Sequence, residues 1–115
     1  ISFHKSYHGN TMGSLSISGN ETKKAAFRPL IPDVDFIQLN RWEDLDRITS
    51  NTAGVILEPV QGDAGVRTAH NDYLVALRNK CTEVGALLIL FFSTSLILQF
   101  FIMIGQLKKQ RLKWI

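Results

Sequence analysis

The chain has 115 residues, with 13 lysines and arginines against 10 aspartates and glutamates, so its formal net charge at pH 7 is +3. Four of the basic residues lie between 108 and 115, and residues 1–107 therefore carry nine basic and ten acidic groups, a net charge of −1. The body of the chain lacks the basic, aromatic-rich character of a nucleic-acid-binding protein, so we expect no nucleic-acid partner. The single cysteine, Cys81, excludes an intrachain disulfide.

The N-terminal third predicts short elements separated by turns. Residues 1–17 mix small, polar and apolar side chains around Gly9 and Gly13, which is typical of a strand end and a turn and does not favour a helix. Residues 18–34 then predict a loop, in which two prolines favour extended backbone.

A short strand and a short helix are predicted next. The stretch at residues 35–40 favours a strand. Asn40 is placed as a helix N-cap, with Glu43 three residues later in the position of a capping box. We therefore expect a helix over residues 41–49.

The strongest pattern is strand, helix, strand between residues 53 and 90. Residues 53–60 form a β-branched run that ends at a proline, which indicates a buried strand. A helix capped by Asn71 and ended by Gly85 follows, and then a third apolar strand at 86–90. We expect these two strands to be parallel and buried, with the chemistry in the loops beyond their carboxyl ends.

Three stretches in order resemble one enzyme family: SYHGNTMGSLSISG at 6–19, FRPLIPDV at 27–34 and GVILEPVQGDAGVR at 54–67. Together they resemble the class III pyridoxal-phosphate (PLP) aminotransferases, most closely the acetylornithine/ornithine branch. The resemblance implies an α/β fold, with residues 1–90 as a piece of the large domain of a fold-type I PLP enzyme built on a parallel-sheet βαβ unit. It also implies PLP as cofactor, an amino-acid donor with 2-oxoglutarate as acceptor, a homodimer and a cytoplasmic location.

The resemblance also assigns candidate site residues. Tyr7 would lay its ring on the cofactor, with His8 and Glu58 also on the cofactor side; the alternatives are a half-buried core tyrosine and an ordinary acid at a strand end. Asp63 matches a substrate-region acid that is more often glutamate and that can pair with an arginine in the family. His4 and His8 are four residues apart, a spacing that would bring the two histidines together only on a helix. Because no helix is expected there, we expect no metal site.

The family pattern stops after residue 90. The family continues with an aspartate that pairs with the pyridine nitrogen of PLP, and here that position holds Phe91. No lysine of this chain stands in the context of the family's Schiff-base lysine, so no catalytic residue is assigned. We expect residues 1–90 to be a partial aminotransferase domain, residues 91–115 to be unrelated to the family, and the chain to be an inactive fragment.

The C-terminal segment leaves two interpretations open. Residues 86–107 form an apolar run long enough to span a bilayer, and four basic residues follow it. One interpretation is a single-pass membrane protein with a vestigial aminotransferase-like binding module. We favour the other, in which a buried strand is joined to an apolar, helical tail by a shifted reading frame or an assembly junction, because a buried parallel strand needs sheet neighbours.

Overall fold

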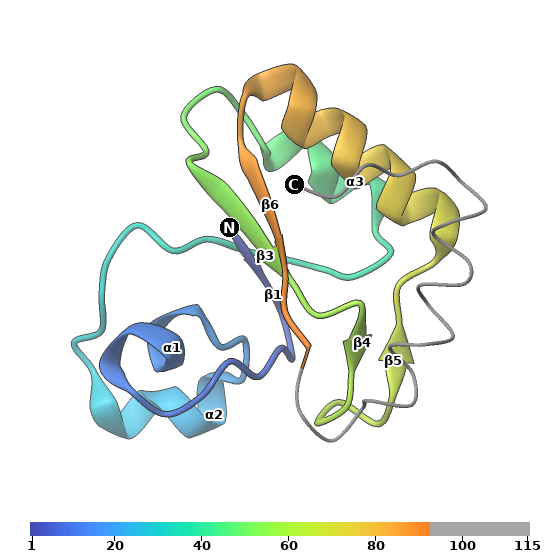
Figure 1. Cartoon of the computed structure of the whole chain (residues 1–115). Coiled ribbons are helices and arrows are strands. Elements are labelled where there is room, and N and C mark those ends of the chain that lie inside the picture. The colour runs from blue at the N-terminus through green and yellow to red at the C-terminus, as the bar shows by residue number, and fades with distance from the viewer. Residues whose placement is uncertain (93–115) are drawn as a thin grey trace.

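The computed structural model describes residues 1–92 of the chain (Figure 1). Within that range the strands are β1 (Ser2–Phe3), β2 (Phe36–Ile37), β3 (Gly54–Leu57), β4 (Val60–Gln61), β5 (Arg67–Thr68) and β6 (Leu87–Leu90). The α-helices are α1 (Met12–Ile17), α2 (Glu21–Lys24) and α3 (Asn71–Val84), and the 3-10 helices are η1 (Ala25–Phe27) and η2 (Trp42–Arg47). The predicted α/β class is confirmed.

The centre of the fold is a set of parallel strands. β3 pairs with β6, and β1 pairs with β2, in both cases in parallel. Ile1 joins the two pairs, because its amino group donates to the Gly54 carbonyl at 2.8 Å and its own carbonyl accepts from the Ile56 amide at 3.0 Å. The strands therefore lie in the order β2, β1, β3, β6, and the predicted parallel pairing is confirmed.

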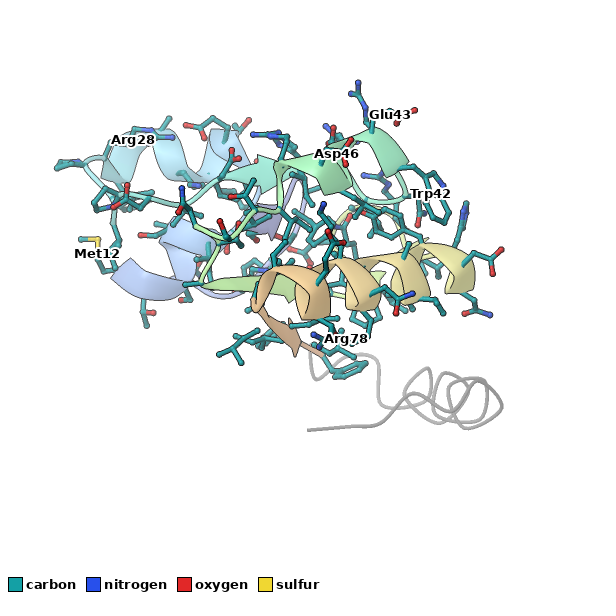
Figure 2. The ribbon with its side chains drawn as sticks, turned by 90° about the horizontal axis from the view of Figure 1, so that it is seen from above. Met12, Arg28, Trp42, Glu43, Asp46 and Arg78 are labelled. Carbon is teal, nitrogen blue, oxygen red and sulfur yellow. The ribbon has the colours of Figure 1, made fainter. Side chains whose placement is uncertain are left out.

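Helix α3 covers one face of these strands (Figure 1). Its buried side chains recur three or four residues apart and belong to one core cluster with Val55 and Leu57 of β3; they are Tyr73, Leu74, Leu77 and Cys81. This spacing places one apolar stripe against the sheet. Trp42 of η2 lies at the outside of the fold (Figure 2). Its ring is edge-on to that of Tyr73, at a centroid distance of 5.7 Å.

The predicted end of α3 is confirmed and its predicted start is one residue late. Gly85 has a φ of 80° and its amide donates to the Thr82 carbonyl, as expected for a left-handed C-cap. The N-cap is His70, and Asn71 is the first helical residue.

The prediction of no helix in residues 1–17 is wrong, because Met12–Ile17 form α1. The helix begins at a capping box in which the Ser14 amide donates to Thr11 Oγ1 and the Thr11 amide donates to Ser14 Oγ. Serine at the third helical position replaces the usual glutamate, which is why the box escapes the sequence pattern. The predicted loop that follows also contains the short helices α2 and η1.

Asn40 is not the cap of the next helix. The helix is the 3-10 element η2, and Arg41 occupies its N-cap position. Asn40 has a φ of 62°, and its side-chain amide donates to the Thr68 carbonyl and accepts from the His70 amide, at 2.9 and 2.8 Å. The residue therefore links this turn to the start of α3.

The outer face of β6 is apolar and open within the described part of the chain. Leu87 and Ile89 are 69% and 50% exposed. We expect Leu87→Lys to lower self-association of the full chain, because an edge strand with an exposed apolar face promotes pairing between molecules and a lysine there opposes it. Sedimentation velocity at matched concentrations measures the change.

Met12→Lys is the matched control for this prediction. Met12 is 59% exposed and lies on α1, away from β6 (Figure 2). It receives the same new charge and loses a similar exposed apolar side chain, so it is expected to leave self-association unchanged. Equal reductions by the two variants would show that net charge, and not the face of β6, controls association.

The membrane interpretation finds no support in the described residues. Between residues 1 and 92 no helix has the length and apolar character needed to cross a bilayer. The first residues of the proposed span, Leu87–Leu90, are a strand hydrogen-bonded in register with β3. The rest of the predicted span and the predicted helical tail lie outside the described residues.

Candidate functional site

The candidate site lies at the carboxyl ends of β1 and β3, where the loops after these two strands meet. A pocket of about 470 Å³ opens there. It is lined by the loop after β1, by α2 and the turn before it, and by the loop between β4 and β5. The charged and aromatic residues among its lining are Lys5, Tyr7, Glu21, Lys23 and Asp63. This volume suits a small organic ligand.

Glu58 links the loop after β1 to the end of β3 by a hydrogen bond. Its Oε2 accepts a hydrogen bond from the Tyr7 amide at 2.8 Å, across 51 residues of sequence, and the residue is only 2% exposed. Burial raises the pKa of the Glu58 carboxyl, the Tyr7 amide opposes that rise, and the nearby Asp63 carboxylate adds to it. The buried carboxylate thus has a partner, as a buried acid requires.

Tyr7 and Asp63 face the pocket together with a lysine. Lys23 Nζ lies 3.3 Å from Asp63 Oδ2 and 5.4 Å from the centroid of the half-buried Tyr7 ring. The ion-pair partner of Asp63 in the described residues is therefore this lysine, where the family resemblance implies an arginine.

His8 lies behind the pocket in a buried polar cluster. Its backbone amide donates to Ser18 Oγ at 2.9 Å, and its Nε2 lies 3.4 Å from Ser2 Oγ. Because the Ser2 hydroxyl already donates to the Ile17 carbonyl at 2.6 Å, the Ser2 oxygen accepts from His8 Nε2–H. His8 Nδ1 is buried and has no hydrogen-bond partner in residues 1–92.

Phe91 packs against the His8 ring. The two rings meet edge to face, with centroids 5.1 Å apart and an interplanar angle of 74°. Burial lowers the pKa of the His8 imidazole to about 4, so the ring is neutral at pH 7. The carboxyl end of β6 thus presents an apolar ring beside a neutral histidine.

These residues do not fit PLP at its pyridine nitrogen. Bound PLP requires a lysine for the Schiff base and a charged partner, commonly an aspartate, at the ring nitrogen. Phe91 supplies no charge there. Lys5 and Lys23 line the pocket, and Lys23 is paired with Asp63, whereas Lys24 donates to the Ser16 carbonyl. Lys24 is itself buried, with its ammonium 4.2 Å from the Phe36 ring centroid.

The two histidines considered as metal ligands lie against different aromatic rings. His4 packs against Phe36, with centroids 5.8 Å apart, whereas His8 packs against Phe91. In residues 1–92 no group of three or more histidine, cysteine or acidic side chains could hold a metal ion.

The structure thus brings Tyr7 and Asp63 to one pocket and places Glu58 and His8 behind it. Sequence reasoning missed the contacts of Lys23 and of Ser18. Both depend on the path of the chain through α1 and α2, and no short motif marks either residue.

The parallel βαβ unit, with an aromatic–His–Gly turn beside the acid that ends β3, defines part of the large domain of a fold-type I PLP enzyme. The family model for class III aminotransferases matches residues 1–90, and the chain belongs to this family.

Relatives with curated names share this segment. An acetylornithine aminotransferase, mitochondrial, from Yarrowia lipolytica is 51% identical over 89 residues, which are 77% of this chain and 22% of that protein. A [LysW]-aminoadipate semialdehyde/glutamate semialdehyde transaminase from Sulfurisphaera tokodaii is 44% identical over 89 residues, 77% and 23% of the two chains. The chain therefore spans less than a quarter of the length of these relatives.

Solved structures show the same fold. The ornithine aminotransferase from Toxoplasma gondii ME49 superposes with a TM-score of 0.72 at 27% identity, covering 78% of this chain and 22% of that one. A PLP-bound amine transaminase from an uncultivated Pseudomonas species gives a TM-score of 0.68 at 28% identity, covering 77% and 25%.

Proposed function

We propose that residues 1–90 form one wall of the cofactor and substrate site of an aminotransferase that moves an amino group from an acetylornithine- or ornithine-like donor to 2-oxoglutarate. We also propose that the 115-residue chain does not perform this reaction by itself. The names of the relatives support the donor class. The observation that carries the proposed inactivity is Phe91, which follows β6 and packs against the His8 ring.

Within the complete enzyme the candidate residues divide into two groups. Tyr7, His8 and Glu58 belong to the cofactor side, with Glu58 holding the Tyr7 loop in place. Asp63 belongs to the substrate side of the same pocket. A homodimer and a cytoplasmic location are part of the proposal, although the Yarrowia relative is described as mitochondrial.

The full chain mixed with PLP is expected to show neither turnover nor an absorption band that depends on one lysine. The physical reason is that the site offers no charged partner for the ring nitrogen. Absorbance scans before and after addition of an amino donor make the measurement. A band that persists through every single lysine substitution indicates adventitious binding, whereas a band and turnover abolished by one substitution contradict the proposal.

The division of the chain at residue 90 has its own test. We propose that residues 91–115 are foreign to the aminotransferase domain. The nucleotide sequence around codon 91 is expected to encode Asp-Glu-x-Gln-Thr-Gly in a shifted frame. If none of the three frames encodes that motif, the C-terminal segment is a genuine part of this protein and the proposed division by frame is wrong.

A further inference from the structure

Strand β2 lies at one edge of the parallel sheet, beside β1. The carbonyls of Asp35 and Ile37 accept from backbone amides of the β1 segment, at 2.8 and 2.9 Å. Because the backbone groups of successive residues in a strand point to opposite sides, those of Phe36 and Gln38 point outward, away from β1. Such outward groups are the ones with which another strand would pair.

Side chains of the same chain occupy both outward groups of Phe36. Its amide donates to Asp35 Oδ1 and its carbonyl accepts from Arg47 Nη1, both at 2.9 Å. Arg47 also pairs with the Asp35 carboxylate through Nη2. The two charged side chains therefore stand along the edge of β2, where a neighbouring strand would lie.

Gln38 is occupied in the same way. Its amide donates to Asp44 Oδ2 at 2.7 Å, and its carbonyl accepts from the Tyr73 hydroxyl at 3.4 Å. The Asp44 side chain is only 13% exposed, and its other oxygen lies 3.4 Å from Arg41 Nε. Asp44 and Arg47 both belong to η2, so this short helix supplies the side chains that close the edge.

We propose that Asp35, Asp44 and Arg47, here called the β2 cover, form an autoinhibitory contact at the sheet edge on which a second copy of this chain would otherwise pair. A second copy fits the uncovered edge because antiparallel pairing of β2 with β2 is self-complementary, each strand offering the same amides and carbonyls. The inference goes beyond the proposed function, since it involves neither the pocket nor a cofactor.

The β2 cover acts on association more than on stability. The Arg47 and Asp35 side chains are 46% and 54% exposed, and an ion pair so open to water contributes little to folding. Charged side chains on a short edge strand do oppose the approach of another strand, and β2 has only two residues. Removal of the cover is therefore expected to free the edge while the fold remains.

The test starts from the full chain with Leu87→Lys, in which β6 is already disfavoured as a pairing edge. Asp44→Ala/Arg47→Ala in this background uncovers the Gln38 amide and the Phe36 carbonyl. Sedimentation velocity is expected to show an association constant at least about tenfold higher, which corresponds to one or two net backbone hydrogen bonds.

Asp46→Ala/Arg78→Ala in the same background is the matched control. It removes the same two charges from η2 and α3 (Figure 2). The control is expected to leave the association constant unchanged. A rise equal to that of the cover variant would show that loss of charge, and not the edge of β2, controls association, and would overturn the proposal.

Amide hydrogen exchange identifies the surface that pairs. With the cover intact the Gln38 amide should exchange slowly, because its acceptor is a carboxylate that is largely buried. In Asp44→Ala/Arg47→Ala it should exchange faster at low protein concentration and become protected again as the concentration rises. The amide of Leu77, a buried residue of α3, reports whether the fold is intact.

Arg47→Ala alone keeps the test decisive if the double variant loses protection at Leu77. It removes a half-exposed side chain, uncovers only the Phe36 carbonyl, and is expected to raise association about threefold. A folded variant that associates no more than the control, or that associates without renewed protection of Gln38, would overturn the proposal. These outcomes are independent of the PLP and codon 91 experiments.

Discussion

Replacing Gly19 with alanine is expected to destabilise the fold by more than about 3 kcal/mol, beyond the usual cost of overpacking. A Cβ at Gly19 would lie 2.0 Å from the Phe3 carbonyl oxygen and 2.7 Å from the Lys5 amide nitrogen. Both are backbone atoms, so no side chain can turn away to make room. Gly19 also exchanges backbone hydrogen bonds with Lys5 and Ser6, which hold the loop that carries Tyr7.

Gly13→Ala is the control for that substitution. An added Cβ at Gly13 meets no atom within 4 Å, and the residue lies inside α1. Alanine there is expected to stabilise the fold by about 0.5–1 kcal/mol through its better helix propensity. Urea unfolding of the full chain, followed by circular dichroism, measures both changes. A loss for Gly19→Ala no larger than 1 kcal/mol would show that the loop can move away from β1.

Phe91→Asp is expected to raise the pKa of His8 from about 4 to above its ordinary value near 6.5. The new carboxylate would stand beside the ring that Phe91 now covers, and it would accept a hydrogen bond from protonated Nδ1, the atom that has no partner in residues 1–92. Nε2–H would keep its bond to Ser2. Titration of the His8 ring protons by NMR gives the pKa, with His4 and His70 as internal references.

The contribution of His8 to the stability of the fold should change with pH in opposite directions in the natural chain and in Phe91→Asp. In the natural chain the folded pKa of His8 is lowered, so the contribution of the neutral ring is complete above pH 6.5 and is lost as the pH falls towards 4, by about 3 kcal/mol. In Phe91→Asp the folded pKa is raised, so the pair stabilises below pH 6.5 and its contribution is lost as the pH rises through the new pKa. Phe91→Asn, which hydrates the site without adding charge, is expected to raise the pKa less than Phe91→Asp. A pKa that stays near 4 in Phe91→Asp would show that position 91 does not face His8.

The βαβ unit could be predicted from sequence because its signals are local and long. The apolar stripe of α3 repeats over fourteen residues, and Gly85 occupies the position where a left-handed backbone ends the helix. The two strands are continuous apolar runs, which is the pattern of buried parallel strands. The predicted burial holds for Val55 and Leu57 of β3 but is wrong for β6, where Leu87 and Ile89 are exposed within the described residues.

The elements before residue 50 were harder because tertiary contacts decide them. α1 has six residues and a serine in place of the glutamate of a usual capping box. Asn40 stands in the sequence pattern of a helix N-cap, yet its side chain hydrogen-bonds to the backbone of Thr68 and His70, which are distant in sequence. A local pattern cannot reveal a partner some thirty residues away.

The candidate site divides in the same way. Tyr7, Glu58 and Asp63 could be named from their motifs, and the structure places two of them at one pocket and the third behind it. Lys23 could not be named, because its role depends on a contact with Asp63 across forty residues. The unpartnered Nδ1 of His8 could not be foreseen either, since it depends on the fold turning Nε2 toward Ser2.

The position of β1 between β2 and β3 also determines how long β1 lacks its second neighbour while the chain is being synthesised. Ile1 donates to Gly54, 53 residues further along, so β1 is synthesised long before β3, its second neighbour. At about 5–20 residues per second, that interval lasts roughly 3–10 s. For this time β1, with the apolar side chain of Phe3, is available to chaperones and to other nascent chains. Codon usage between residues 4 and 53 therefore sets how long the future middle of the sheet stays exposed.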